Sequence, residues 1–279
     1  MKVNCALAEN PTMKKVVFGF SFLLFLLPFF THCNAQTWTM VWHDEFNDSA
    51  INRQNWTFDT GTDGDGWGNQ ELEYYTGRPE NARILNGNLL IVAKKERFNK
   101  CKYTSARLKT QDLKTFTYGK IEARIKLPMK QGLWPAFWML GNNIDDIGFP
   151  QCGEIDIMEY VNEDRTNHGT MHWQSNHELA SYGGTTIVDN PNDFHIYTVE
   201  WDSNSIKWFV DDKQYWEGLV KNNINQTFAF HRPFYILLNM AVGGEWPGKP
   251  KHRTHLPDTM YVDYVRVYKM DSLVKEGTR

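Results

Sequence analysis

The chain has 279 residues and a formal net charge of −3, and aromatic residues make up 14% of it. Acidic and basic residues are mixed along the chain without a basic block, which argues against nucleic acid and anionic membrane as partners. This length is enough for one large all-β domain with a full core once a leader has been removed.

The first part of the chain has the features of a secretory signal peptide. Two lysines precede an apolar run at residues 16–30, and small and polar residues follow up to Ala35. The run is short for a membrane-spanning helix. We therefore predict that residues 1–35 are removed and that the mature chain is secreted, extracellular or periplasmic, without membrane contact. A retained anchor and a lipid-modified Cys33 are the alternatives.

Short strands separated by Gly, Asn and Pro turns follow in the mature region. Predicted strands cover residues 38–46, 81–86, 89–93, 118–127, 133–140, 153–160, 168–172, 194–201, 206–210, 233–242 and 261–268. Alternation of apolar and polar residues is clearest at 118–127, and the mature region has no convincing helical period longer than about two turns. The pattern predicts an all-β sandwich over residues 36–270 and a frayed tail at 271–279.

The predicted strand Gly-Glu-Ile-Asp-Ile-Met-Glu-Tyr carries three acids. Glu154 and Asp156 are two positions apart and share a face, whereas Glu159 points the other way on a regular strand. One extra residue, a β-bulge near Ile157 or Met158, returns Glu159 to the acidic face. Neighbouring like charges drive pKa values apart, so this arrangement is expected where one carboxyl holds a proton and its neighbour does not.

Such a set of acids suits the hydrolysis of a glycosidic bond. Two carboxyls about 5–5.5 Å apart define a retaining glycoside hydrolase, in which one attacks the anomeric carbon and the other acts as acid and then base. Glu154 and Glu159 can converge on one sugar, with Asp156 between them. Chain position alone does not say which glutamate attacks.

Several tryptophans are candidates for stacking on sugar rings. Trp134 and Trp138 share one face of the strand before the acids, while Trp67, Trp173 and Trp246 lie in predicted loops or strand ends.

Histidines and cysteines leave further alternatives open. His172 shares a strand face with His168 and can hydrogen-bond an active-site acid, but no third ligand at suitable spacing supports a zinc site. Cys101 and Cys152 remain after cleavage, either as a disulfide or as two separate thiols.

The acidic strand resembles the bulged active-site motif of family 16 of the glycoside hydrolases, specifically the laminarinase-like endo-β-1,3-glucanases. The resemblance extends over about 38–268. It is supported by the segments Trp-His-Asp-Glu-Phe at 42–46, Tyr-Gly-Lys-Ile-Glu-Ala-Arg at 118–124, Gly-Leu-Trp-Pro-Ala-Phe-Trp-Met-Leu at 132–140, Gly-Thr-Met-His at 169–172, Asn-Met-Ala-Val-Gly-Gly at 239–244 and Tyr-Val-Asp-Tyr-Val-Arg-Val-Tyr at 261–268.

This resemblance implies a jelly-roll β-sandwich of two curved antiparallel sheets with a concave substrate cleft. It implies that Glu154 is the nucleophile and Glu159 the general acid/base, assisted by Asp156. The substrate-binding residues that it implies are Asn69, Arg107, Trp134, Trp138, His172 and Trp246.

The resemblance implies no cofactor for catalysis but a structural calcium ion far from the cleft. Its ligands map to Glu45, the carbonyl of Gly87 and Asp263, oxygen donors that suit calcium. One departure from the family pattern is Glu245, which stands where many laminarinases have Asn, and it puts fine specificity in doubt.

These observations predict a secreted, retaining endo-hydrolase of laminarin-type β-1,3-glucan, active also on mixed-linkage β-1,3-1,4-glucan. We expect a monomer whose partner is the β-glucan polysaccharide. A galactan hydrolase of the agarase or carrageenase type and a non-catalytic glucan-binding module are the alternatives.

Overall fold

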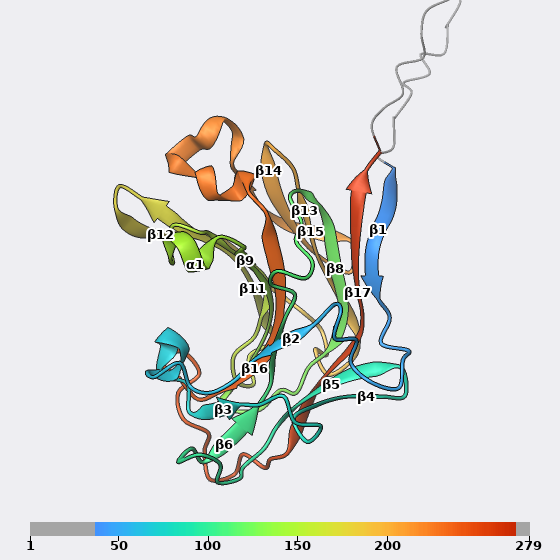
Figure 1. Ribbon diagram of the computed structural model, residues 1–279, viewed down its shortest axis with the longest axis vertical. Coiled ribbons are helices and arrows are strands. Elements are labelled where there is room, and N and C mark those ends of the chain that lie inside the picture. The colour runs from blue at the N-terminus through green and yellow to red at the C-terminus, as the bar shows by residue number, and fades with distance from the viewer. Residues whose placement is uncertain (1–36, 272–279) are drawn as a thin grey trace, which may run out of the picture. The chain divides into compact units, whose positions relative to one another are not determined.

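Two antiparallel β-sheets lie face to face in the part of the chain that the computed structural model describes, residues 37–271 (Figure 1). The predicted signal peptide, residues 1–35, and all but the first residue of the predicted tail lie outside the described residues. Within residues 37–271, no helix is long and apolar enough to cross a membrane.

The first sheet contains eight strands. Its order is β15 (Lys213–Leu219), β14 (Ser205–Val210), β13 (His195–Trp201), β8 (Gly119–Lys126), β17 (Asp258–Met270), β5 (Asn88–Ala93) and β4 (Ala82–Leu85), and β1 (Trp38–Asp44) also pairs with β17. Strands adjacent in this sheet come from distant parts of the chain, because β8 lies between β13 and β17.

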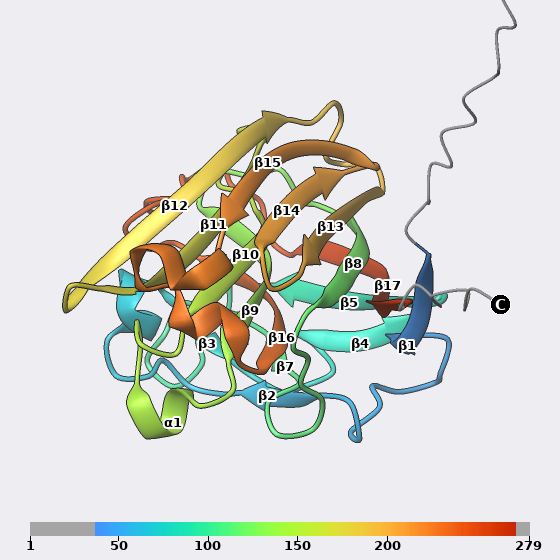
Figure 2. The same cartoon turned by 90° about the horizontal axis from the view of Figure 1, so that it is seen from above.

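The second sheet contains seven strands and carries the candidate site. Its order is β12 (Glu178–Ile187), β11 (Thr166–Ser175), β10 (Glu154–Glu159), β9 (Leu133–Gly141), β16 (Phe234–Val242), β7 (Arg107–Lys109) and β2 (Thr57–Asp59). A short parallel pair, β3 (Glu73–Tyr75) and β6 (Tyr103–Ser105), and a helix, α1 (Ile144–Ile147), lie outside both sheets. Figure 2 shows the two sheets from above. This architecture confirms the predicted jelly-roll β-sandwich.

The core lies between the sheets and follows the period of two in each strand. In β8, Ile121, Ala123 and Ile125 are fully buried and alternate with polar neighbours. Strand β16 is buried along its whole length, as expected for a strand covered on both faces. Each fully buried Leu, Ile or Val side chain contributes roughly 1.5–3 kcal/mol to this packing.

The edge strands β12 and β15 were not predicted from the sequence, and neither were the short strands β2, β3, β6 and β7. In β12 the alternation is broken by Gly183 and Gly184, and most of the strand is exposed. A Cβ atom on Gly184 would lie 2.4 Å from the Trp216 side chain of β15, so the glycine allows the edges of the two sheets to meet. Tertiary packing therefore outweighs the low strand propensity of glycine.

The two cysteines of the mature region are separate thiols. Cys152 is fully buried beside Leu140, and Cys101 lies in the loop between β5 and β6; neither forms a disulfide. The disulfide alternative is therefore wrong, and no disulfide braces the acidic strand.

Candidate active site

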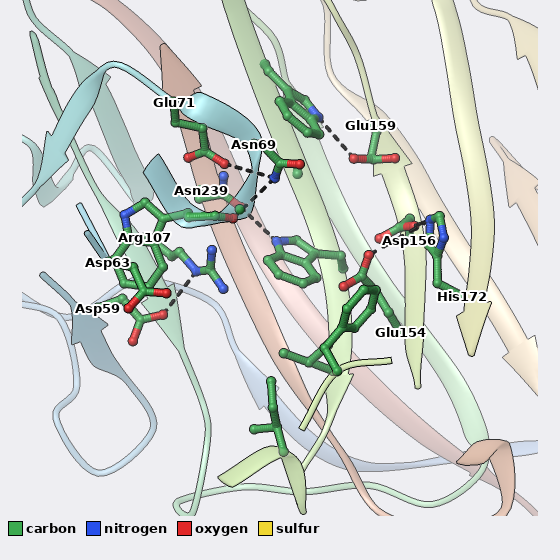
Figure 3. A pocket seen from close by; sticks show the side chains of 18 of the residues that line it. Asp59, Asp63, Asn69, Glu71, Arg107, Glu154, Asp156, Glu159, His172 and Asn239 are labelled. Atoms are coloured by element: carbon green, nitrogen blue, oxygen red, sulfur yellow. Dashed lines mark hydrogen bonds and ion pairs between the residues drawn. The ribbon is translucent and has the colours of Figure 1, made fainter. Parts of the chain in front are cut away.

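Strand β10 contains the predicted bulge. On its β11 side, Asp156 pairs with Thr170 and Glu159 pairs with His168, so three steps along β10 match two along β11. The register with β9 shifts at the same place. The two residues that form the bulge, Ile157 and Met158, are fully buried. Consequently all three acids line the cleft, as Figure 3 shows.

A cleft of about 950 Å³ crosses the outer face of this sheet. Every cleft residue that the sequence predicted lines it: Asn69, Arg107, Trp134, Trp138, Glu154, Asp156, Glu159, His172 and Trp246. They come from loops and strands far apart in the chain. The second sheet and the loops beside it therefore bring this set to one surface.

His172 and Trp134 make direct polar contacts to the acids. The Nε2 atom of His172 lies 3.1 Å from Oδ2 of Asp156 and 3.9 Å from Oε1 of Glu154. The Trp134 indole Nε1 donates a hydrogen bond of 3.0 Å to Oε1 of Glu159. Glu154 keeps 20% of its side chain exposed, whereas Asp156 keeps 3%. A ligand in the cleft can therefore reach Glu154 more easily than Asp156.

Burial dominates the electrostatics of the three acids. It raises the pKa of Asp156 from 3.8 to about 8. Burial, and then the charge of Asp156, raise the pKa of Glu154 and of Glu159 well above the usual range. The charge of His172 acts in the opposite direction on both glutamates. The three carboxyls therefore do not all ionise together at neutral pH, and at least one proton stays in the cluster.

The floor of the cleft contains a directional chain of hydrogen bonds that starts at Trp138. Its Nε1 donates to Oδ1 of Asn239 at 2.7 Å, and Nδ2 of Asn239 donates to the Tyr75 hydroxyl at 3.1 Å. That hydroxyl donates to Oε2 of Glu71 at 2.9 Å. We call these four residues the Trp138 chain. Because every donor points the same way, the chain ends on a carboxylate acceptor and fixes the orientation of the indole.

Arg107 lies between two aromatic rings in the cleft. Its guanidinium carbon is 4.7 Å from the ring centroid of Trp67 and 4.8 Å from that of Trp138. Its Nε atom is 3.0 Å from Oδ2 of Asp59. Cation–π contacts and the ion pair hold the arginine in place beside the Trp138 chain (Figure 3).

Two loops meet at Glu245. Its carboxylate accepts a hydrogen bond of 2.5 Å from Nε2 of Gln70, and its backbone N–H donates to the Asn69 carbonyl at 2.8 Å. The next residue, Trp246, packs edge-on against Trp134 with ring centroids 5.3 Å apart. Glu245 therefore joins the loop that carries Asn69 to the loop that carries Trp246.

A family model described as glycosyl hydrolases family 16 matches residues 69–266 of this chain. The chain belongs to family 16 of the glycosyl hydrolases. Among curated relatives of this family 16 chain, the Clotting factor G alpha subunit of Tachypleus tridentatus is 43% identical over 83% of this chain and 34% of that protein. The Beta-glucanase of Rhodothermus marinus is 43% identical over 84% of this chain and 86% of that protein. This chain thus spans about a third of the first relative and most of the second.

Among solved structures, the laminarinase catalytic domain from Thermotoga maritima is similar to this family 16 chain. The identity is 44% and the TM-score 0.79, with 84% of this chain and 99% of that domain covered.

The residues predicted to bind calcium lie on the other sheet. Asp44, the last residue of β1, pairs with Val265 in β17, and the first residues of β5 pair with β17 near Val262. Glu45, Asp263 and the β4–β5 turn with Gly87 therefore come together beside the middle of β17. Two carboxylates and a carbonyl are suitable oxygen donors for calcium.

Each of these two carboxylates already has an arginine partner. Arg266 donates two hydrogen bonds of 2.8 Å to Glu45, and these bonds lower the pKa of Glu45. The Nη1 atom of Arg124 lies 2.7 Å from Oδ2 of Asp263. A calcium ion at this site would therefore compete with two ion pairs.

Of the tryptophans considered for sugar stacking, Trp173 lies outside the cleft, and three residues of the Trp138 chain were missed from the sequence. Trp173 is a core residue with 6% exposure, and its Nε1 donates to the Asn225 carbonyl instead of facing the cleft. The missed residues are Glu71, Tyr75 and Asn239 of the Trp138 chain. Asn239 had a signal in the sequence, since it interrupts the apolar run of β16.

Proposed function

We propose that this family 16 chain is a retaining endo-hydrolase of β-1,3-glucan of the laminarin type, active also on mixed-linkage β-1,3-1,4-glucan. The observation that carries the proposal is the bulge of β10, which directs Glu154 and Glu159 into one cleft with Asp156 between them. Relatives named as a beta-glucanase and a laminarinase support β-glucan as the substrate class.

In the proposed reaction, a carboxylate oxygen of Glu154 attacks the anomeric carbon and forms a glycosyl ester. Glu159 transfers its proton to the leaving glycosidic oxygen as the bond to the anomeric carbon breaks. Glu159, now ionised, then removes a proton from a water molecule, which attacks the same carbon and releases Glu154. The configuration at the anomeric carbon is inverted twice and is therefore retained.

The surroundings of the two glutamates support these roles. His172 and Arg107 both act to lower the pKa of Glu154 and so offset part of the rise that burial and Asp156 cause. Arg107 does not contribute in this way to Glu159, whose pKa burial raises against the opposing effects of the Trp134 hydrogen bond and His172. A protonated Asp156, next to Glu154, can donate a hydrogen bond to the nucleophile and withdraw it again as the ester forms.

The cations of the cleft favour a neutral glucan over a sulfated galactan. Among the described residues that line the cleft, the Lys and Arg side chains are Lys109 and Arg107, and both pair with Asp59, at 2.7 Å and 3.0 Å. Neither is left to bind a sulfate group. Release of reducing sugar from laminarin, lichenan, agarose and carrageenan tests this proposal, and activity confined to a galactan would refute it.

Replacement of the nucleophile separates catalysis from binding. We expect Glu154→Gln to lose turnover by at least about 10³-fold while it still binds laminarin, because the neutral amide cannot form the glycosyl ester. Unchanged turnover would contradict the role of Glu154. Absence of hydrolysis by the parent chain, with laminarin binding intact, would favour the alternative of a non-catalytic glucan-binding module.

We further propose that the chain is exported with cleavage after Ala35 and acts as a monomer. N-terminal sequencing of the mature protein tests the first part, and a mature chain that keeps residues 1–35 contradicts it. Light scattering of the purified protein tests the second.

We also propose that Glu45, the carbonyl of Gly87 and Asp263 hold a structural calcium ion. Such an ion would hold the end of β1, strand β17 and the β4–β5 turn together by coordinating one oxygen ligand from each. It has no part in the proposed reaction, because these residues belong to the sheet opposite the cleft.

A further inference from the structure

Three potential metal ligands converge inside the candidate active site. One carboxylate oxygen each from Glu154 and Asp156 and a ring nitrogen of His172 all lie within 4.8 Å of one another. The sequence had suggested only a pairing of His168 with His172, which lacked a third ligand. The bulged strand and its pairing with β11 supply two oxygen ligands instead, since Glu154 lies directly opposite His172.

The histidine is held in the orientation that a ligand needs. Its Nδ1 atom lies 2.6 Å from the Ser181 hydroxyl on β12, so the tautomer that donates Nδ1–H to that oxygen presents the Nε2 lone pair to the acids. Metal-binding histidines are commonly fixed in this way by a partner on the other ring nitrogen.

One of the carboxylate oxygens has no hydrogen-bond partner. Oδ2 of Asp156 is fully buried, and its 3.1 Å contact with His172 lacks hydrogen-bond geometry. A buried acceptor without a donor is unfavourable, because it has lost its hydrogen bonds to water and gained none in the protein. Coordination of a cation would satisfy this oxygen, so the cluster has a reason to bind one that three exposed carboxyls would not have.

The spacing and chemistry of the ligands select the ion. Zinc binds histidine nitrogen and carboxylate oxygen at about 2.0–2.2 Å, and in a tetrahedral site its ligands lie roughly 3.3–3.6 Å apart. The His172 distances to the two acids, 3.1 Å and 3.9 Å, bracket this range. Magnesium and calcium prefer sites made of oxygen alone.

We propose that Glu154, Asp156 and His172 form a binding site for a zinc-class divalent cation in the substrate-free protein, and that this ion blocks the cleft. The Glu154 lone pair that coordinates the ion is unavailable for attack on a sugar. The inhibitory consequence rests on the proposed hydrolase function, whereas binding of the ion does not. Zinc and glucan should therefore exclude each other.

Zinc binding is measured by calorimetry on the metal-free mature chain, without any assay of activity. We expect one zinc ion more per chain in the parent protein than in His172→Gln, or an affinity at least about tenfold weaker in that variant. The matched control is His168→Gln, which removes a cleft histidine outside the cluster and should leave this binding event unchanged. Equal binding in parent and His172→Gln would overturn the proposal.

A second variant covers the case in which His172→Gln does not fold. Ser181→Ala removes only the partner of Nδ1 and should weaken zinc binding about tenfold, because the ring is no longer fixed. Unchanged affinity in this variant would count against the site.

Steady-state kinetics on laminarin then test whether bound zinc prevents glucan from binding in the cleft. Zinc should raise the apparent KM and leave kcat unchanged, whereas a fall in kcat alone would contradict competition. A chain that binds zinc in the expected pattern but does not hydrolyse glucan would refute the proposed function and leave the metal site intact.

Discussion

Asp156 is the residue at which the fold and the proposed chemistry conflict most. It is almost fully buried between two other acids, and burial holds its pKa at about 8. A carboxyl in such a place normally costs stability once it ionises. In the proposed reaction a protonated Asp156 can donate a hydrogen bond to the ionised nucleophile Glu154, while Glu159 carries the proton that is transferred to the leaving group.

The first prediction concerns the pH dependence of stability. The pKa of Asp156 is raised in the folded chain, so the folded state binds the proton of this carboxyl more tightly than the unfolded state does. The contribution of Asp156 to the free energy of unfolding is therefore lost as pH rises from about 4 to about 8. Asp156→Asn removes the titrating carboxyl and with it this loss of stability at higher pH. We expect its free energy of unfolding, relative to the parent, to improve on the order of 5 kcal/mol between pH 4 and pH 8. Urea unfolding at several pH values measures this.

Asp146→Asn in α1 is the matched control, because that aspartate is exposed. It should leave the pH profile of stability unchanged. A parent and an Asp156→Asn variant with parallel profiles would show that Asp156 does not hold a proton in the folded chain.

The second prediction concerns the Trp138 chain. Tyr75→Phe removes the hydroxyl that accepts from Asn239 and donates to Glu71. Two buried polar groups lose a partner, so we expect a loss of about 1–3 kcal/mol in stability. Because the indole of Trp138 is no longer fixed, KM for laminarin should rise several-fold while kcat changes less than about twofold.

The control for this variant is Tyr182→Phe on β12, an exposed tyrosine whose hydroxyl has no hydrogen-bond partner among the described residues. It should match the parent in KM and stability. A Tyr75→Phe variant that loses stability with KM unchanged would limit the Trp138 chain to a structural role.

At the scale of elements, the cleft depends on two loops that meet above the second sheet. Residues 61–70 and 243–248 are joined by Gln70–Glu245 and by the backbone bond from Glu245 to Asn69. The second loop also carries Trp246. The Glu245 side chain therefore takes part in a contact between loops, in addition to placing a carboxylate in the cleft.

The third prediction follows from this contact. Glu245→Ala removes the acceptor of Gln70, and Trp246 loses its anchor, so KM should rise about three- to tenfold with kcat nearly unchanged. Stability should change by less than about 1 kcal/mol, because the contact is exposed. Glu245→Gln keeps an acceptor oxygen and should restore most of the affinity. If both variants behave alike, the charge of Glu245 and not the loop contact matters.

At the scale of the whole described molecule, the two sheets have different tasks. The seven-stranded sheet carries the cleft, and the eight-stranded sheet closes the core and carries the proposed calcium residues. Loss of the ion should therefore affect stability and not the chemistry in the cleft.

The fourth prediction tests that separation. A calcium concentration of 100 times Kd stabilises a folded protein by about 2.7 kcal/mol, which corresponds to roughly 5–10 °C in Tm for a chain of this size. We expect chelation to lower Tm by this amount while kcat measured well below Tm is unchanged. Asp263→Asn should abolish the effect of calcium. An unchanged Tm on chelation would mean that the Arg266 and Arg124 ion pairs hold these carboxylates instead.

Sequence alone determined the features that depend on the alternation of side chains between the two faces of a strand and on the family motif. The alternation of β8, the hairpin turn between β4 and β5 and the bulge of β10 follow from side chains that alternate every residue along a strand. The faces of Glu154, Asp156 and Glu159 could be derived from that rule, and so could the shared face of Trp134 and Trp138.

Only the tertiary structure decided which distant segments touch. Tyr75 and Asn239 are 164 positions apart and Trp138 and Asn239 are 101 apart, so no local pattern reveals their hydrogen bonds. The same holds for the burial of Trp173 and the separation of the two cysteines. Strand order in a jelly roll sets these contacts, and that order results from the packing of whole sheets, not from the period of any one strand.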